Sequence, residues 1–270
     1  NADITTASQV TGLTAGVTAV AAGGNHSCAI VAGAAQCWGI NTYGQVGDST
    51  NTDRNAPVAA TGLGTGVTQI VAGNEHTCVL ANGGVQCFGR NQFGQVGDST
   101  NTNRNAAVAV TGLGSNVLSI AAGSNHTCAL KTDATVECWG LNANGQLGDN
   151  TIIDSNISVA VFGITSVTAI AAAGNHTCAM AAGALFCWGS NNKGQLGDGT
   201  IVDQLTAVVV SGLIANVTSV ALGGEHSCAI VSGSLKCWGA NHYGQLGNST
   251  TIDSLTASSV SSTRSFTSVS

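Results

Sequence analysis

Histidine and cysteine have the widest chemistry of any side chains in this sequence, and they recur at fixed spacing. A histidine stands two residues before a cysteine in the pattern H-[ST]-C, and a second cysteine follows after eight or nine intervening residues. Such a set can form a disulfide, or it can supply three ligands to zinc, which needs a fourth. The unit occurs five times, with its histidines at His26, His76, His126, His176 and His226.

The cysteines favour disulfides over a metal site. Each pair falls on the two strands of a predicted hairpin, where opposed Cα atoms lie about 4.5–5.5 Å apart, within reach of a disulfide. No fourth zinc ligand recurs in every repeat, so zinc is the alternative and no cofactor is expected. Ten cysteines that pair without remainder also indicate an oxidising compartment. The predicted bonds are Cys28–Cys37, Cys78–Cys87, Cys128–Cys138, Cys178–Cys187 and Cys228–Cys237.

Short β-strands must position these residues. The histidines recur every 50 residues, and Gly, Asn, Asp and Ser separate four strand signals in each repeat. In the first repeat these signals are residues 17–20, 26–30, 36–38 and 56–60. Four strands in a repeat of this length predict an all-β fold, a β-propeller of about five four-stranded blades with one disulfide in each. The predicted repeats of this single domain, 1–270, are 12–61, 62–111, 112–162, 163–211 and 212–261.

The repeat resembles a known family. The pattern G-x-x-H-[ST]-x-A-[LI], followed by [CY]-W-G-x-N-x-x-G-Q-L-G, resembles the regulator-of-chromosome-condensation repeat over essentially the whole chain. The resemblance implies a propeller but no single function, because the family includes exchange factors for a small GTPase, light sensors, secreted β-lactamase inhibitors and bacterial surface proteins. About seven repeats are typical there, and the cysteine pairs resemble a secreted prokaryotic branch. The exchange activity is not carried over, because the repeat is scaffold.

The repeated polar residues indicate architecture rather than catalysis. A catalytic centre is a unique constellation, whereas these residues recur in every repeat, so we predict that the protein is not an enzyme. We expect each histidine to bond a neighbouring backbone carbonyl in the interior. The aromatic residue after the second cysteine is interpreted as structural too, at Trp38, Phe88, Trp139, Trp188 and Trp238.

Two further sets of polar residues are candidates for binding or modification. After each G-Q-[LV]-G turn a short side chain can cap loop amides or, as the less favoured alternative, bind calcium. This series is Asp48, Asp98, Asp149, Asp198 and Asn248. Sequons near predicted turns are candidate glycosylation sites, at Asn156, Asn216 and Asn248. Sequons inside the histidine motif are interpreted as coincidental, at Asn25, Asn125 and Asn175.

Charge and hydropathy exclude two classes of partner. The net charge is −6 and the seven lysines and arginines are scattered, so we expect no nucleic-acid partner. No apolar stretch approaches the roughly 18 residues of a spanning helix, so we expect no membrane span. The sequence begins without an apolar leader, as a mature secreted chain would. Together with the cysteines, this predicts an extracellular or cell-surface location.

The chain ends carry more strand signals than five blades need. Residues 4–10, with Ile4 and Val10, resemble a fourth strand, and residues 265–269, with Phe266 and Val269, resemble a first strand. Strands in the terminal segments 1–11 and 262–270 can close the ring or pair with another subunit. The leading hypothesis is therefore a homopolymeric fibre with head-to-tail contacts. The alternative is a monomeric secreted module that binds a protein or a glycan.

Overall fold

A computed structural model gives the fold and describes residues 6–262 and 264–270. These residues form strands and turns but no helix, and so no helix that could span a membrane. Their twenty strands make five antiparallel sheets of four, each with its strands in chain order. The predicted all-β propeller with four-stranded blades is confirmed.

Each sheet is one blade, and blades 1 to 5 follow the chain. Blade 1 has β1 (Val17–Ala22), β2 (His26–Val31), β3 (Ala34–Gly39) and β4 (Arg54–Ala59). Blade 2 has β5 (Val67–Ala72), β6 (His76–Ala81), β7 (Gly84–Gly89) and β8 (Arg104–Ala109). Blade 3 has β9 (Val117–Ala122), β10 (His126–Lys131), β11 (Val136–Gly140) and β12 (Ser155–Ala160). Blade 4 has β13 (Val167–Ala173), β14 (His176–Ala181), β15 (Ala184–Gly189) and β16 (Gln204–Val209). Blade 5 has β17 (Val217–Leu222), β18 (His226–Val231), β19 (Ser234–Gly239) and β20 (Ser254–Ser259).

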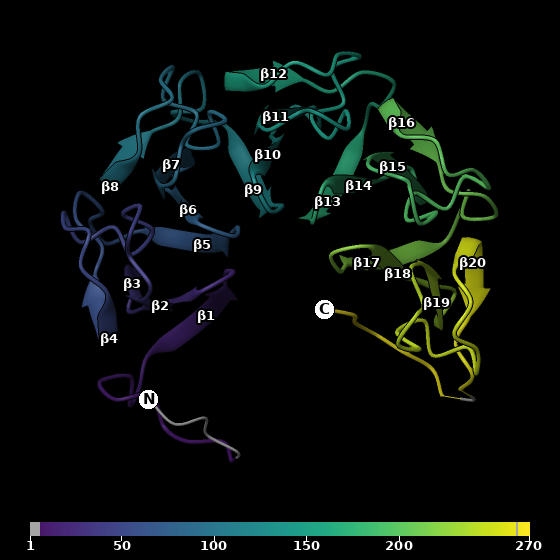
Figure 1. Cartoon of the computed structure of the whole chain (residues 1–270), viewed down its shortest axis with the longest axis horizontal. Coiled ribbons are helices and arrows are strands. Elements are labelled where there is room, and N and C mark those ends of the chain that lie inside the picture. Colours follow the sequence, from purple (N-terminus) through teal and green to yellow (C-terminus); the bar gives the residue numbers. More distant parts are fainter. Residues whose placement is uncertain (1–5, 263) are drawn as a thin grey trace.

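The blades form an open arc rather than a closed ring. Figure 1 shows the first strand of each blade near the central axis, the fourth strand at the outside, and a gap between blades 1 and 5. Successive inner strands touch, because β1 contacts β5, β5 contacts β9, β9 contacts β13 and β13 contacts β17. No contact of comparable extent joins β17 to β1 in the described part of the chain. Two blade faces are therefore left without a neighbouring blade.

A tight hairpin joins the second and third strands. In blade 1 only Ala32 and Gly33 separate β2 from β3, with φ of 50° and 80°. Two left-handed residues make a turn whose twist matches the flanking strands, and glycine adopts that conformation without steric cost. In blade 3 the longer connection at residues 132–135 takes up the extra residue between Cys128 and Cys138. The two cysteines therefore still lie opposite each other.

The extra terminal strands predicted from the sequence are not found. Ile4 lies outside the described residues, and residues 6–16, which include Val10, form no strand. Residues 264–270, which include Phe266 and Val269, form none either. A strand needs a neighbouring strand to bond its N–H and C=O groups, and a chain segment without that partner stays irregular. The described parts of the terminal segments are therefore irregular in a single chain, and their pairing with another subunit stays a prediction.

Candidate functional site

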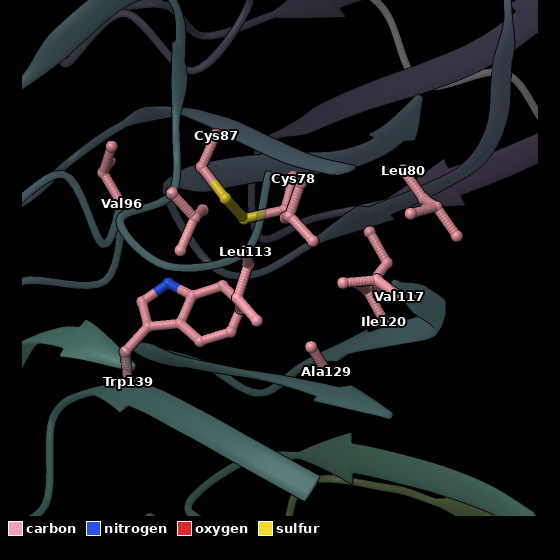
Figure 2. Packing of buried hydrophobic residues seen from close by; sticks show 11 residues of the cluster. Cys78, Leu80, Cys87, Val96, Leu113, Val117, Ile120, Ala129 and Trp139 are labelled. Carbon is pink, nitrogen blue, oxygen red and sulfur yellow. A yellow bond between two sulfur atoms is a disulfide. The ribbon is translucent and has the colours of Figure 1, made fainter. Parts of the chain in front are cut away.

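The hydrophobic core is divided among the interfaces between successive blades. We call the face that a blade turns toward the preceding blade its front face, and the opposite face its rear face. Figure 2 shows the interface between blades 2 and 3, where the two faces interdigitate. The rear face of blade 2 contributes residues such as Cys78, Leu80, Cys87, Val96 and Leu113, and the front face of blade 3 contributes Val117, Ile120, Ala129 and Trp139. The other three interfaces repeat this pattern.

Each blade contains the disulfide predicted from the sequence. All ten cysteines are bonded in the expected pairs, and each pair joins the second strand to the third. Residues such as Cys28 and Cys37 are direct cross-strand partners, as predicted, and the paired Cα atoms are 4.0–4.1 Å apart, closer than expected. The bond leaves no thiolate for zinc, so the zinc alternative is wrong. Nowhere in residues 6–262 or 264–270 do three His, Cys, Asp or Glu side chains group as metal ligands.

A ladder of hydrogen bonds crosses every interface. His26 Nε2 lies 2.8 Å from Thr77 Oγ1 in the next blade, and the Thr77 hydroxyl donates to the Gln45 carbonyl at 2.9 Å. Because that hydroxyl has one proton, His26 Nε2 must be the donor, and the imidazole is the neutral Nε2–H tautomer. The same contact joins His76 to Thr127, His126 to Thr177, and His176 to Ser227.

The expected partner of the histidines, a backbone carbonyl, is therefore wrong. The hydroxyl residue of the next H-[ST]-C motif lies between the imidazole and the carbonyl and relays the bond. Burial, which disfavours the charged form, lowers the pKa of His26 to about 4. Burial and then the neighbouring histidines lower the pKa of His76, His126 and His176 to about 3. These imidazoles are neutral near pH 7, which suits a structural role.

The backbone carbonyl of the G-Q-[LV]-G turn accepts two bonds from the next blade. Gln195 O accepts from the Ser227 hydroxyl at 2.8 Å and from Trp238 Nε1 at 2.9 Å. Trp139 Nε1 donates in the same way to Gln95 O, and Trp188 Nε1 to Gln146 O. In blade 2, Phe88 replaces the tryptophan and has no N–H to donate. The Gln45 carbonyl therefore accepts its side-chain hydrogen bond from Thr77. These aromatic side chains are 0% exposed, so they belong to the interfaces.

A buried asparagine that the sequence interpretation did not single out holds the loop between the third and fourth strands. Asn41 Nδ2 donates to the Asp48 carboxylate and to the Thr50 carbonyl, and Asn41 Oδ1 accepts from the Val46 N–H. The signal was present, because [WF]-G-x-N recurs in each repeat. Asp48 Oδ1 accepts from the Thr50 N–H, as a capping carboxylate does, and Asp48 Oδ2 accepts from Arg54 Nε, so both carboxylate oxygens are bonded. The equivalent asparagines are Asn91, Asn142, Asn191 and Asn241, all 0% exposed.

The candidate glycosylation sites differ in their surroundings. Asn156 Nδ2 donates to Asn101 Oδ1 at 2.9 Å, and Asn248 Oδ1 accepts from the Thr250 hydroxyl at 2.8 Å. Asn216 is exposed in a turn with φ of 60° and forms no side-chain hydrogen bond within the described residues. Asn216 is therefore the candidate whose side chain is free to carry a glycan, and glycosylation stays a prediction.

Several charged residues outside the repeat pattern form separate local groups. Arg90 pairs with Glu75 in blade 2, and Lys131 pairs with Glu137 at 3.0 Å in blade 3. A third group lies where blades 4 and 5 meet, and consists of Lys193, His242 and Asp253. The structure does not bring these groups together.

The front face of blade 1 is only partly covered, by the N-terminal segment. Val17 and Val20 are 41% and 73% exposed, whereas Val67 and Ile70 at the same positions of blade 2 are 4% and 5% exposed. Trp38 is half-buried. A largely apolar hollow of about 400 Å³ lies on this face, and its lining includes Val10, Leu13, Val17, Val20, Ser27 and Trp38.

The rear face of blade 5 is only partly covered, by the C-terminal segment. The Phe266 N–H donates to the Gly233 carbonyl at 3.0 Å, as the Val217 N–H donates to the Gly183 carbonyl at an internal interface. Phe266 therefore lies where the first strand of a following blade would begin. Cys228 stays half-buried, whereas its four equivalents are 0% exposed.

Five blades with apolar faces, a bonded ladder between them and one disulfide each define a β-propeller of the repeat type that the sequence resembles. The chain belongs to the RCC1-like family, because the family model of the RCC1-like domain matches residues 2–270. A search of curated protein sequences found no match.

Solved structures with the same fold include two of a yeast protein. Yeast RCC1 (Prp20) bound to Kap60 has a TM-score of 0.79 at 22% identity, with 92% of this chain and 61% of that chain covered. Prp20p from Saccharomyces cerevisiae gives 0.77 at 23% identity, with 92% and 64% covered. Human WBSCR16 gives 0.69 at 19% identity, with 93% and 84% covered. At these identities the likeness shows the fold alone, and this chain spans about three fifths of the two yeast chains.

Proposed function

We propose that this chain is a non-catalytic, extracellular propeller that assembles head-to-tail with further copies of itself into a fibre. The observation that carries the proposal is the pair of end faces. One end of the arc presents a front face and the other presents a rear face, and these two kinds of face pack together at all four internal interfaces. Five intrachain disulfides suit an oxidising location.

Association would remove apolar surface from water. Val17, Val20 and Trp38 are accessible in the isolated chain and would be covered by the rear face of blade 5 of another copy. A contact between two different surfaces propagates as a filament unless it closes into a ring.

The terminal segments partly cover these two faces in a single copy. Leu13 and Val10 lie against the front face of blade 1, and the Leu13 N–H donates to the Val10 carbonyl as Leu113 donates to Val110 at an internal interface. Phe266 lies at the rear face of blade 5. Both segments occupy places that belong to a neighbouring blade in the interior. We therefore assign the contact to blade faces, with the terminal segments displaced, rather than to paired terminal strands.

Sedimentation velocity over a range of concentrations tests this proposal. The wild-type chain should form progressively larger species, and Val20→Asp should stay monomeric because it places a charge in the contact. Ile153→Asp is the matched control, because Ile153 is 72% exposed in a loop of blade 3 away from both end faces, and it should assemble like wild type. A wild-type chain that stays monomeric at every concentration, or a Val20→Asp variant that assembles normally, overturns the proposal.

A second candidate function is the binding of a partner protein by loops of blades 3 to 5. Five aliphatic side chains there are 61–75% exposed, at Ile152, Ile153, Ile201, Val202 and Ile252. Blades 1 and 2 carry Asn51-Thr52 and Asn101-Thr102 at the corresponding positions. The loops of blades 3 and 4 each expose two adjacent aliphatic side chains, which can serve as a protein contact. Replacing Ile152-Ile153 by the Asn-Thr of blade 1 should abolish binding of a partner isolated by cross-linking, and unchanged binding contradicts this candidate.

A further inference from the structure

The hydrogen-bond ladder stops at blade 1, which has the donors but no preceding blade within the described residues. Ser27 stands at the position of Thr77, Thr127, Thr177 and Ser227, all 0% exposed, but Ser27 is half-buried and lines the hollow on the front face. Within the described residues its hydroxyl has no hydrogen-bond partner, and Trp38 Nε1 has no acceptor. The front face of blade 1 therefore presents an unmatched hydroxyl beside an unmatched indole N–H.

The ladder also stops at blade 5, which has the complementary groups but is followed by no blade in the part of the chain that the structure describes. In the described part of the chain, His226 Nε2 has no partner, whereas the other four histidines each donate to a hydroxyl of the next blade. The Gln245 carbonyl receives no side-chain donor there. Gln245 is half-buried, whereas its equivalents in blades 1 to 4 are at most 2% exposed.

Building on the proposed head-to-tail association, we infer that the unpaired groups of blades 1 and 5 form hydrogen bonds with each other between two copies of this chain. His226 of one copy donates to the Ser27 hydroxyl of the next copy, and that hydroxyl donates to the Gln245 carbonyl of the first copy. Trp38 Nε1 donates to the same carbonyl. Every group then has the partner that its equivalents have inside the chain, as Ser227 and Trp238 have in Gln195.

The polar groups also select the orientation of the contact. Two front faces placed together would oppose two Trp38 N–H donors, and two rear faces would oppose two Gln245 carbonyls. Either arrangement leaves desolvated groups unbonded, which costs more than the bonds would contribute. Only a front face on a rear face pairs each donor with an acceptor. The occupant that fits is therefore blade 5 of a second copy, which continues the interface already repeated four times within the chain.

The aromatic residue of blade 1 supports this assignment. Phe88 shows that an interface of this protein packs fully without an indole, because Phe88 is 0% exposed between blades 1 and 2. Blade 1 nevertheless carries Trp38, whose N–H finds no acceptor within the described residues of its own chain. An indole N–H is useful at this position only when a turn carbonyl such as that of Gln245 reaches it.

Three variants of the full chain test the junction by sedimentation equilibrium. Ser27→Thr should assemble at least as well as wild type, because Thr stands at three of the four internal positions. Ser27→Ala loses two bonds and should associate about tenfold more weakly. Trp38→Phe loses one bond and should associate about threefold more weakly, since Phe88 shows that Phe packs there. None of the three should lower monomer stability, whereas Ser227→Ala, inside the chain, should.

Tryptophan fluorescence gives a second readout. Trp139, Trp188 and Trp238 are 0% exposed, so Trp38 alone among the four tryptophans can become more buried on association. Its emission should shift to the blue as copies assemble, and Trp38→Phe should abolish that shift. Assembly with wild-type strength in both Ser27→Ala and Trp38→Phe, with the wild-type fluorescence shift retained in Ser27→Ala, overturns this junction and leaves head-to-tail association intact. A wild-type chain that stays monomeric overturns both.

Discussion

His26 and Thr77 are 51 residues apart in sequence and belong to different blades, yet the imidazole of one donates to the hydroxyl of the other across 2.8 Å. The histidine of each repeat therefore serves an interface between blades rather than its own blade. Because Thr77 passes the bond on to Gln45, three groups from two blades are held together at each step. These hydrogen bonds join neighbouring blades in addition to the apolar packing between them.

The buried histidines predict that the propeller loses stability in mild acid. The pKa of His26 is about 4 and those of His76, His126 and His176 about 3, against 6.5 in an unfolded chain. Between these values the unfolded chain binds more protons, so stability falls as the pH drops below 6.5. The loss is roughly 2 kcal/mol for each histidine at pH 5. Thermal unfolding at pH 8 and pH 5 measures it, and equal melting temperatures would contradict the prediction.

The exposed histidine provides the control for that experiment. His242 is outside the ladder and is 59% exposed. The variant His242→Gln should therefore show the same difference in melting temperature between pH 8 and pH 5 as the wild-type chain.

Close approach of the inner strands predicts that Gly73→Ala is destabilising. A Cβ at Gly73 would overlap the His76 ring and lie 2.7 Å from the Gly123 carbonyl oxygen of the next blade. Overpacking of this kind costs about 1–3 kcal/mol and should lower the melting temperature by at least about 3 °C. Gly114→Ala is the control, because a Cβ there meets nothing within 4 Å. A Gly73→Ala chain that melts with the control would show that the blades are less closely packed.

Each disulfide should contribute separately to stability. Replacing Cys78 and Cys87 by alanine opens a loop with a sequence separation of 9, which costs roughly 2.5 kcal/mol in the chain-entropy view. A cavity term adds to this, because both sulfurs are in the core between blades 2 and 3. The same change at Cys228 and Cys237 should cost less, since Cys228 is half-buried at an end face. Calorimetry of the two variants compares them, and a larger loss at the second pair would be inconsistent with this description.

Removing the terminal segments should strengthen association. Deletion of residues 1–11 and 262–270 uncovers the front face of blade 1 and frees the Gly233 carbonyl that Phe266 now occupies. Light scattering should then detect assembly at a severalfold lower concentration than for the full chain. The terminal-strand hypothesis predicts the opposite, because it needs those residues for pairing. Loss of assembly in the truncated chain would restore that hypothesis.

The repeat made the blade predictable from sequence. Alternating residues and turn chemistry placed the strands to within about two residues, as where the signal at 56–60 became β4 at Arg54–Ala59. The cysteine pairs were predictable too, because the two strands of a hairpin are close in sequence. One blade differs in its cysteine spacing, and a longer turn takes up that difference.

Relationships between repeats were not predictable in the same way. The partner of His26 lies in the next blade, and a repeating pattern does not tell which neighbour's group faces the ring. Residues 265–269 resemble a first strand, but without a second strand beside them they do not form one. Whether the blades form an open arc or a closed ring depends on the angle between packed sheets, and this angle could not be predicted from the composition or from the spacing of the repeats. For that reason the uncovered faces became visible only in the structure.

The most direct measurement of the central claim is cryo-electron microscopy of the full chain at the concentration where it assembles. We predict fibres in which the rear face of blade 5 of one copy covers Val20 and Trp38 of the next, with the Gln245 carbonyl at hydrogen-bond distance from the Trp38 indole. Isolated open arcs, or fibres whose copies touch through other surfaces, would contradict it.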